Sequence, residues 1–157
     1  MKTPRLLCVL LLVSTFYAVL ASAQQLTVQN ESGKQTVLSR ADVESLPHIR
    51  VATGSSTFEG VALQAVLEKA GVEFGEALRG KRLASYLLVE AADGYKVVFA
   101  LPEIDSAFGE KQVILAFLKD GKPLDAKEGP YRIVIPEENR MARWVRQVVA
   151  LRILNAP

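Results

Sequence analysis

The chain has 157 residues, with 19 lysines and arginines against 17 aspartates and glutamates, and a single histidine and cysteine. A net charge of +2 provides no strong positive field, so a general nucleic-acid-binding protein is disfavoured. One cysteine and one histidine exclude an internal disulfide, an iron–sulfur cluster bound by this chain alone and a multi-histidine metal site.

The chain begins with a segment typical of a secretory signal peptide. A short basic start is followed by an apolar stretch over 6–20 and by small residues at 21–23. We expect cleavage after Ala23, which makes 1–23 a signal peptide and 24–157 one folded domain. The leader carries the only cysteine, Cys8, and two basic residues but no acid, so the mature chain has zero net charge. We therefore expect a periplasmic or secreted protein with no stable membrane anchor after cleavage.

The first part of the mature chain has the pattern of a hairpin followed by a short helix. Two alternating runs, Leu26 to Gln29 and Gln35 to Leu38, flank a turn-rich pentad. Ser39 and Asp42 have the spacing of a capping box, and Pro47 ends the helix that they begin.

The next segments predict a strand, a loop and the most regular helix of the chain. The strand is expected over His48 to Thr53 and the loop over 54–57. Apolar residues at helical spacing run from Leu63 to Ala70, and Gly71 follows where a helix commonly ends.

From Tyr86 onward the pattern predicts strands. The runs Tyr86 to Ala91 and Tyr95 to Ala100 flank an Asp-Gly pair, which is a strong hairpin signal. Further apolar runs cover Gln112 to Lys119 and Tyr131 to Pro136, and a closing strand is expected from Val145 to Ile153.

Strands thus outnumber helices, and the two do not alternate as in βαβ units. We expect a single α+β domain with a mostly antiparallel or mixed sheet and two or three short helices.

The sequence contains no familiar catalytic motif. A G-x-S-x-G elbow, a phosphate-binding Walker loop and an H-E-x-x-H helix are all absent. A lone histidine such as His48 is more often structural than catalytic. We therefore assign no catalytic residue and no metal ligand. Whether His48, Tyr95 and Tyr131 face one cleft stays open.

The C-terminal part departs locally from charge balance. Between residues 132 and 157 there are two acids and no lysine, but five arginines: Arg132, Arg140, Arg143, Arg146 and Arg152. The planar guanidinium suits phosphate or carboxylate, which allows a local anion site. Alternatively, Arg146 and Arg152 form the solvent face of the closing strand.

Several segments, in order, resemble blocks of the oxidoreductase molybdopterin-binding domain, which has the sulfite-oxidase-type fold. The resemblance spans about residues 58–154. Its blocks are Phe58–Leu63 before Leu67 and Ala70-Gly71, Ala92–Tyr95, Val113–Phe117 leading into Asp120–Leu124, Gly129–Pro136, and Arg140 with Arg143–Val145.

The resemblance implies a cofactor site. In family members with cofactor, the segment corresponding to residues 132–144 helps to hold the phosphate tail of the pterin. Arg132, Arg140 and Arg143 are therefore the candidate ligands of an anion or of the pterin phosphate, while Trp144 is expected to pack in the core.

The chain departs from the catalytic members of that family at the metal. Those members bind molybdenum through a cysteine thiolate located before the block that begins here at Phe58, and the mature chain has no cysteine. Ser55, Ser56 and Thr57 offer only hydroxyls, which are poor substitutes for a soft thiolate. Exported molybdenum enzymes also generally leave the cytoplasm folded by the twin-arginine route, whereas this leader has a single arginine.

These features favour a binding module over an enzyme. The expected role is to bind an anionic small molecule or an envelope protein partner. We expect no nucleic-acid binding, no molybdenum catalysis and no bound cofactor. Molybdopterin remains implied by the resemblance, and the alternative is a genuine molybdopterin-dependent oxidoreductase or a subunit of one. A further alternative is a structural or sensor partner of a membrane complex.

Overall fold

The computed structural model describes residues 25–157, so the predicted leader lies outside the described residues. The described chain starts with the predicted hairpin, formed by β1 (Leu26–Gln29) and β2 (Gln35–Leu38). A short helix, α2 (Arg40–Glu44), follows at once. The side chain of Ser39 accepts a hydrogen bond from the backbone N–H of Asp42, whose carboxylate accepts one from the backbone of Ser39. The predicted capping box is therefore confirmed.

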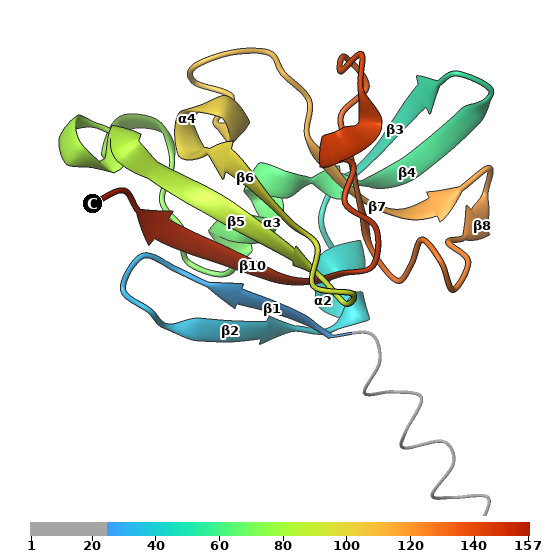
Figure 1. Ribbon diagram of the computed structural model, residues 1–157, viewed down its shortest axis with the longest axis horizontal. Helices are drawn as coiled ribbons and strands as arrows, with labels where there is room; N and C mark the ends of the chain where they lie inside the picture. Colours follow the sequence, from blue (N-terminus) through green and yellow to red (C-terminus); the bar gives the residue numbers. More distant parts are fainter. Residues whose placement is uncertain (1–24) are drawn as a thin grey trace, which may run out of the picture.

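Five strands form one twisted sheet in the order β2-β1-β10-β5-β6 (Figure 1). The predicted Asp-Gly hairpin supplies β5 (Ser85–Ala91) and β6 (Lys96–Ala100), and the closing strand is β10 (Val148–Asn155). β1 and β10 pair in parallel, with Thr27 opposite Ala150, whereas the other neighbours are antiparallel. The sheet is therefore mixed, and it joins the two ends of the described chain.

A second sheet contains β3 (His48–Thr53), β4 (Ser56–Ala62) and β7 (Ile114–Lys119) in that order. Two short strands, β8 (Lys122–Pro123) and β9 (Arg132–Val134), pair with different parts of β7. In Figure 1 this sheet lies at the right, away from the end of the first sheet where β10 terminates.

The predicted loop over 54–57 is wrong for its second half, because Ser56 and Thr57 belong to β4. Thr53 pairs with Ser56, which leaves only two residues to turn the chain. Gly54, with φ +60°, adopts the left-handed conformation that such a turn requires. The sequence pattern missed β4 because glycine interrupts its alternation at Gly60.

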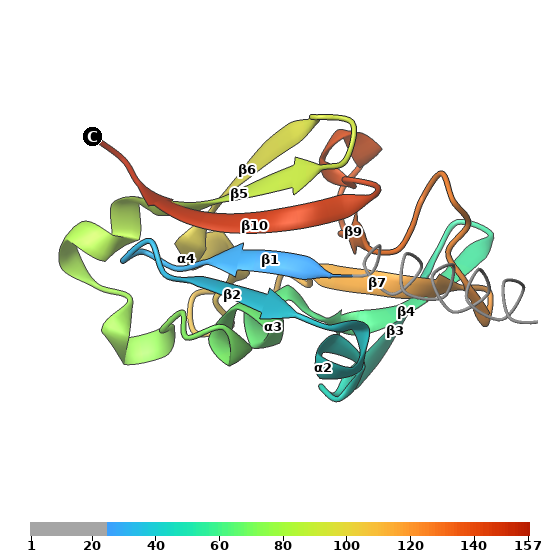
Figure 2. The ribbon, with the colours of Figure 1, turned by 90° about the horizontal axis from the view of Figure 1, so that it is seen from below.

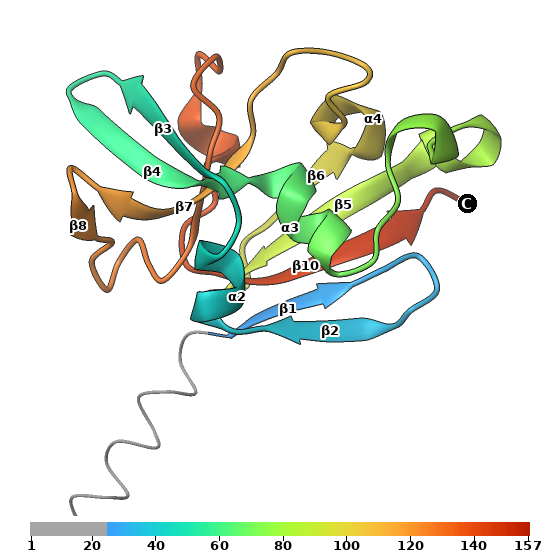
Figure 3. The ribbon, with the colours of Figure 1, turned by 180° about the vertical axis from the view of Figure 1, so that it is seen from behind.

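Two further helices connect the sheets. α3 (Leu63–Lys69) begins directly where β4 ends, and α4 (Leu101–Ile104) directly follows β6. Figure 2 shows the strands of the first sheet as one layer with α2 and α3 below it, and Figure 3 shows these two helices from behind.

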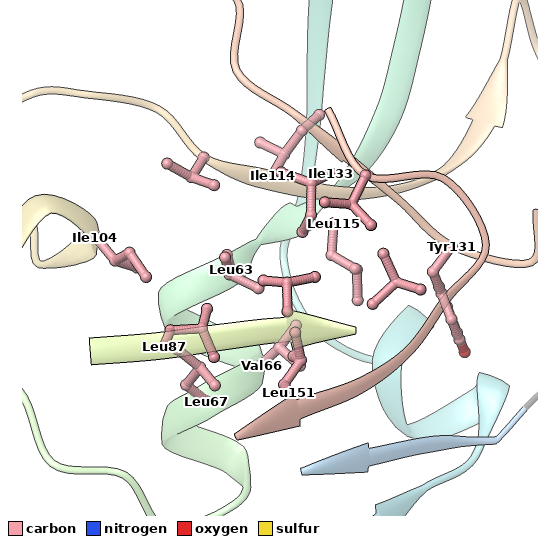
Figure 4. Packing of buried hydrophobic residues seen from close by; sticks show 14 of the residues in the cluster. Leu63, Val66, Leu67, Leu87, Ile104, Ile114, Leu115, Tyr131, Ile133 and Leu151 are labelled. Carbon is pink, nitrogen blue, oxygen red and sulfur yellow. The ribbon is translucent and has the colours of Figure 1, made fainter. Parts of the chain in front are cut away.

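The core lies between α3 and the two sheets (Figure 4). Leu63, Val66 and Leu67 are fully buried on the inner face of α3, as their spacing predicts. They pack among side chains from β5, β7, β9 and β10, so one hydrophobic cluster contains residues of both sheets. Each such leucine contributes about 1.5–3 kcal/mol by burial.

The remaining regular segments are short 3₁₀ helices, which the sequence patterns did not predict: Gly75–Ala77, Gly80–Ala84 and Met141–Arg143. The predicted α+β class with a mixed sheet and short helices is confirmed. Within residues 25–157, no helix has the length and apolar character needed to cross a membrane.

Candidate functional site

A pocket of about 310 Å³ opens beside the turn between β3 and β4. Its walls come from that turn, from β4, β7 and β9, and from the 3₁₀ segment before β10. The lining residues are Thr53, Gly54, Ser55, Ser56, Phe58, Lys119, Glu128, Arg132, Met141 and Trp144. The volume lies at the small end of the range for ligand-binding pockets.

Arg132 on β9 is the central cation of this pocket and is only 8% exposed. Its guanidinium lies over two aromatic rings, 5.2 Å from the centroid of Phe58 and 5.6 Å from that of Trp144. One terminal nitrogen donates to the carboxylate of Glu128. Among the described residues, its buried Nε finds no acceptor. Burial lowers the pKa of Arg132 from its usual value, and the group stays charged at neutral pH.

Trp144 forms a second wall and is 4% exposed. Its ring meets Phe58 edge to face, with centroids 6.1 Å apart and planes at 87°. Its buried indole N–H also lacks an acceptor within the part of the chain that the structure describes. An unsatisfied buried donor costs about 1–3 kcal/mol, and native proteins normally satisfy such groups with protein, water or a ligand.

Two cations and one carboxylate line the pocket, which leaves it one net positive charge. Lys119 Nζ lies 3.5 Å from Glu128 Oε2 and 5.6 Å from the centroid of Phe58. Arg146, outside the pocket wall, lies near enough to lower the pKa of Arg132 further by charge repulsion. The local field therefore favours an anion.

The loop before β9 fixes Glu128 in this arrangement. The Asp125 side chain accepts a hydrogen bond from the backbone N–H of Glu128 at 3.0 Å. The carbonyl of Glu128 accepts one from the backbone of Gln147 at 2.9 Å. The Glu128 side chain is only 15% exposed, so its carboxylate is held against both cations.

The structure does not bring the three predicted arginines together in this pocket. Arg143 donates to Glu103 and Glu138, and its guanidinium lies 4.7 Å from the centroid of the Phe99 ring. The bonds to these carboxylates raise the pKa of Arg143 above its usual value. Arg140 is exposed and precedes the 3₁₀ segment. Only Arg132 lines the pocket.

His48, Tyr95 and Tyr131 occupy different surroundings. His48 on β3 is partly exposed and packs edge-on against Phe117. Tyr95 donates its hydroxyl proton to the carbonyl of Ala142 and lines a separate pocket of about 280 Å³. Tyr131 is fully buried, and burial raises its pKa to about 12.

Sequence reasoning missed the roles of Glu128, Lys119 and Phe58 in this pocket. Trp144 is buried as predicted, and it also lines the pocket. Neither a lone glutamate nor a lone lysine carries a recognisable pattern. The arginine excess and the family resemblance over residues 132–144 are the signals that point to this region.

The pocket fits one part of a molybdenum–pterin group and not the other. The buried donors of Arg132 and Trp144 suit the oxygens of an anionic group. For a metal, the walls offer hydroxyl and carboxylate oxygens, from Ser55, Ser56 and Glu128 among others, and the thioether of Met141, but no thiolate. The chain's single cysteine is Cys8, so residues 25–157 supply no thiolate, and they contain no cluster of three or more metal-binding side chains. The described residues therefore do not fit molybdenum held through a thiolate.

The sequence and the fold place the chain in a known class of proteins. The family model of the oxidoreductase molybdopterin-binding domain matches residues 15–156, and the chain belongs to that family. The predicted resemblance over 58–154 is thus confirmed and extended toward the N-terminus.

Among solved structures, the chain is similar to the sulfane dehydrogenase SoxCD from Paracoccus pantotrophus. The two share 20% sequence identity with a TM-score of 0.64, over 85% of this chain and 38% of the SoxCD chain. This likeness confirms the sulfite-oxidase-type fold, and the chain spans well under half the length of that relative. No curated protein sequence matches the chain significantly.

Proposed function

We propose that the chain is a member of the molybdopterin-binding domain family that binds an anionic ligand in the Arg132 pocket and does not itself perform molybdenum redox chemistry. The observation that carries this proposal is that Arg132 and Trp144 both line one pocket and that each has a buried N–H donor without an acceptor among the described residues. A ligand oxygen that reaches both donors removes the cost of leaving them unsatisfied.

The charge of the pocket supports the same role. Glu128 balances only one of the two cations, so an anion completes the neutralisation of a partly desolvated site. Phe58 and Trp144 exclude water from the faces of the Arg132 guanidinium, which strengthens its interaction with a ligand.

The first test is calorimetric titration of the full chain with nitrate, acetate, sulfate and phosphate at constant ionic strength. We expect saturable binding of at least one of these anions. The variant Trp144→Phe keeps the aromatic wall but removes one donor, and we expect it to bind about 10- to 100-fold more weakly, as for the loss of one charge-assisted hydrogen bond.

Arg152→Gln is the matched control, because that arginine pairs with Glu90 on the first sheet. It removes the same charge as a change at Arg132 would, but outside the pocket. We expect an affinity within about twofold of the parent, since exposed ion pairs contribute little. Equal affinities in the parent and in Trp144→Phe would contradict the assigned site.

Family membership favours a second candidate function, a molybdopterin-dependent oxidoreductase or a subunit of one. In that case another chain would supply the missing metal ligand, and the Arg132 pocket would hold the anionic part of the cofactor. The metal and pterin content of the protein distinguishes the two candidates.

The typical leader supports a site of action outside the cytoplasm, in the periplasm or the medium. The ligand is then an anionic small molecule of that compartment, or an acidic group presented by an envelope protein. Cell fractionation of the native host tests the location, and recovery of the uncleaved chain in the cytoplasm would contradict it.

A further inference from the structure

The carboxylate of Glu128 lies inside the same pocket that is proposed to bind an anion. It contacts Arg132 and lies 3.5 Å from the Nζ of Lys119. Since this side chain is only 15% exposed and its backbone is fixed on both sides, it cannot leave the pocket without breaking those contacts. Any ligand must therefore bind beside a resident negative charge.

We infer that Glu128 is a built-in counter-ion that selects singly charged anions, such as carboxylates or nitrate-like oxyanions, over doubly charged ones such as sulfate. This inference rests on the proposed anion site. With Glu128 present, the lining residues carry one net positive charge, which a monoanion neutralises. A dianion would instead leave an excess negative charge. Its attraction to the two cations and its repulsion by the carboxylate of Glu128 both double, whereas the cost of desolvating it grows with the square of its charge.

The geometry leaves room for such a ligand. Glu128 occupies one terminal nitrogen of Arg132, while the Nε of the same guanidinium and the indole N–H of Trp144 keep their donors free among the described residues. Ser55 and Ser56 also line the pocket. A small planar or tetrahedral anion can therefore be bound without displacing Glu128, and the volume of about 310 Å³ suits such a ligand.

The test compares nitrate and acetate with sulfate, using the fluorescence of Trp144, the only tryptophan of the chain, as the readout. Titrations use the full chain at constant ionic strength and neutral pH. We expect the parent to bind the monoanions more tightly than sulfate. Glu128→Gln should raise sulfate affinity more than nitrate affinity, changing the ratio of the two by about tenfold or more, because the benefit of removing one negative charge doubles for a dianion.

Glu138→Gln is the matched control, since it removes a carboxylate that pairs with Arg143 and does not line the pocket. The ratio of its sulfate affinity to its nitrate affinity should equal that of the parent. Lys119→Gln gives an independent reading if Glu128→Gln fails to fold: it lowers the charge of the pocket, so the ratio should move further toward nitrate.

The outcomes separate the two proposals. If anions bind but neither Glu128→Gln nor Lys119→Gln changes the ratio, the selection by Glu128 is overturned and the anion site stands. If no anion changes the fluorescence of the parent and calorimetry detects no binding, the anion site is overturned and the selection with it.

Discussion

At the scale of single residues, the chemistry of this domain depends on how donors and charges are paired. One terminal nitrogen of Arg132 donates to a carboxylate, while its Nε has no acceptor among the described residues. Arg143, in contrast, donates to two carboxylates. Two arginines that look alike in the sequence therefore differ in their capacity to bind a ligand. The sequence could predict a cluster of arginines, but not which of them would meet acids from distant segments such as Glu103.

His48 shows the same dependence on distant partners. Its Nδ1 lies 3.0 Å from the carboxylate of Glu59, and its Nε2 lies 2.9 Å from the carbonyl oxygen of Glu44. Both partners are acceptors, so only the protonated ring can donate to both. The backbone contact with Glu44, followed by the bond to Glu59, raises the pKa of His48 above its usual value, while Arg50 also contacts Glu59.

This arrangement predicts a pH-dependent contribution to stability. Because the folded pKa is raised, the contribution is fully present below the unfolded pKa of about 6.5 and is lost as the pH rises through the folded value. We expect the stability difference between the parent and His48→Gln to shrink from about pH 5.5 to about pH 8.5 by less than about 1 kcal/mol, since the side chain is 42% exposed. Urea unfolding at several pH values measures it, and a difference that grows with pH would contradict the assigned pairing.

At the scale of secondary-structure elements, the close approach of β4 and β7 depends on Gly60. A Cβ at this position would lie 2.2 Å from the carbonyl oxygen of Leu115 and 2.6 Å from the Cα of Ala116. The register between the two strands also shifts between Glu59 and Gly60. This glycine therefore allows the second sheet to form beside the pocket.

We expect Gly60→Ala to lower the free energy of unfolding by at least about 2 kcal/mol, because the clash involves backbone that must shift. Gly109→Ala is the matched control, since its added methyl would meet nothing within 4 Å. It should change stability by less than about 0.5 kcal/mol. Urea unfolding of the two variants measures the difference in stability. Equal unfolding midpoints would contradict the role of Gly60.

Local patterns predicted most elements and missed those that depend on tertiary pairing. The capping box of α2, the apolar spacing of α3 and the Asp-Gly hairpin are local signals, and all three are confirmed. The missed strand β4 pairs with β3 across a two-residue turn, but its other partner, β7, lies far from it in the sequence. The candidate site was predicted only in part for the same reason, since the pocket combines Ser55, Lys119 and Arg132 from three separate segments.

At the scale of the whole molecule, the parallel pairing of β1 with β10 closes the domain. It places the start of the described chain beside its last strand, and one hydrophobic cluster connects this sheet with the one that carries the pocket. A core of this extent supports a family domain that is much shorter than the SoxCD chain.

We propose that this domain uses the family fold to bind an anion without molybdenum. The most direct test of this proposal is the molybdenum and pterin content of the protein purified from the envelope of its own host, measured together by elemental analysis and pterin fluorescence. We expect neither to be present in stoichiometric amount, because residues 25–157 supply no thiolate for the metal. Stoichiometric molybdenum and pterin would contradict the proposal, and would make the protein an oxidoreductase with an unusual metal ligand.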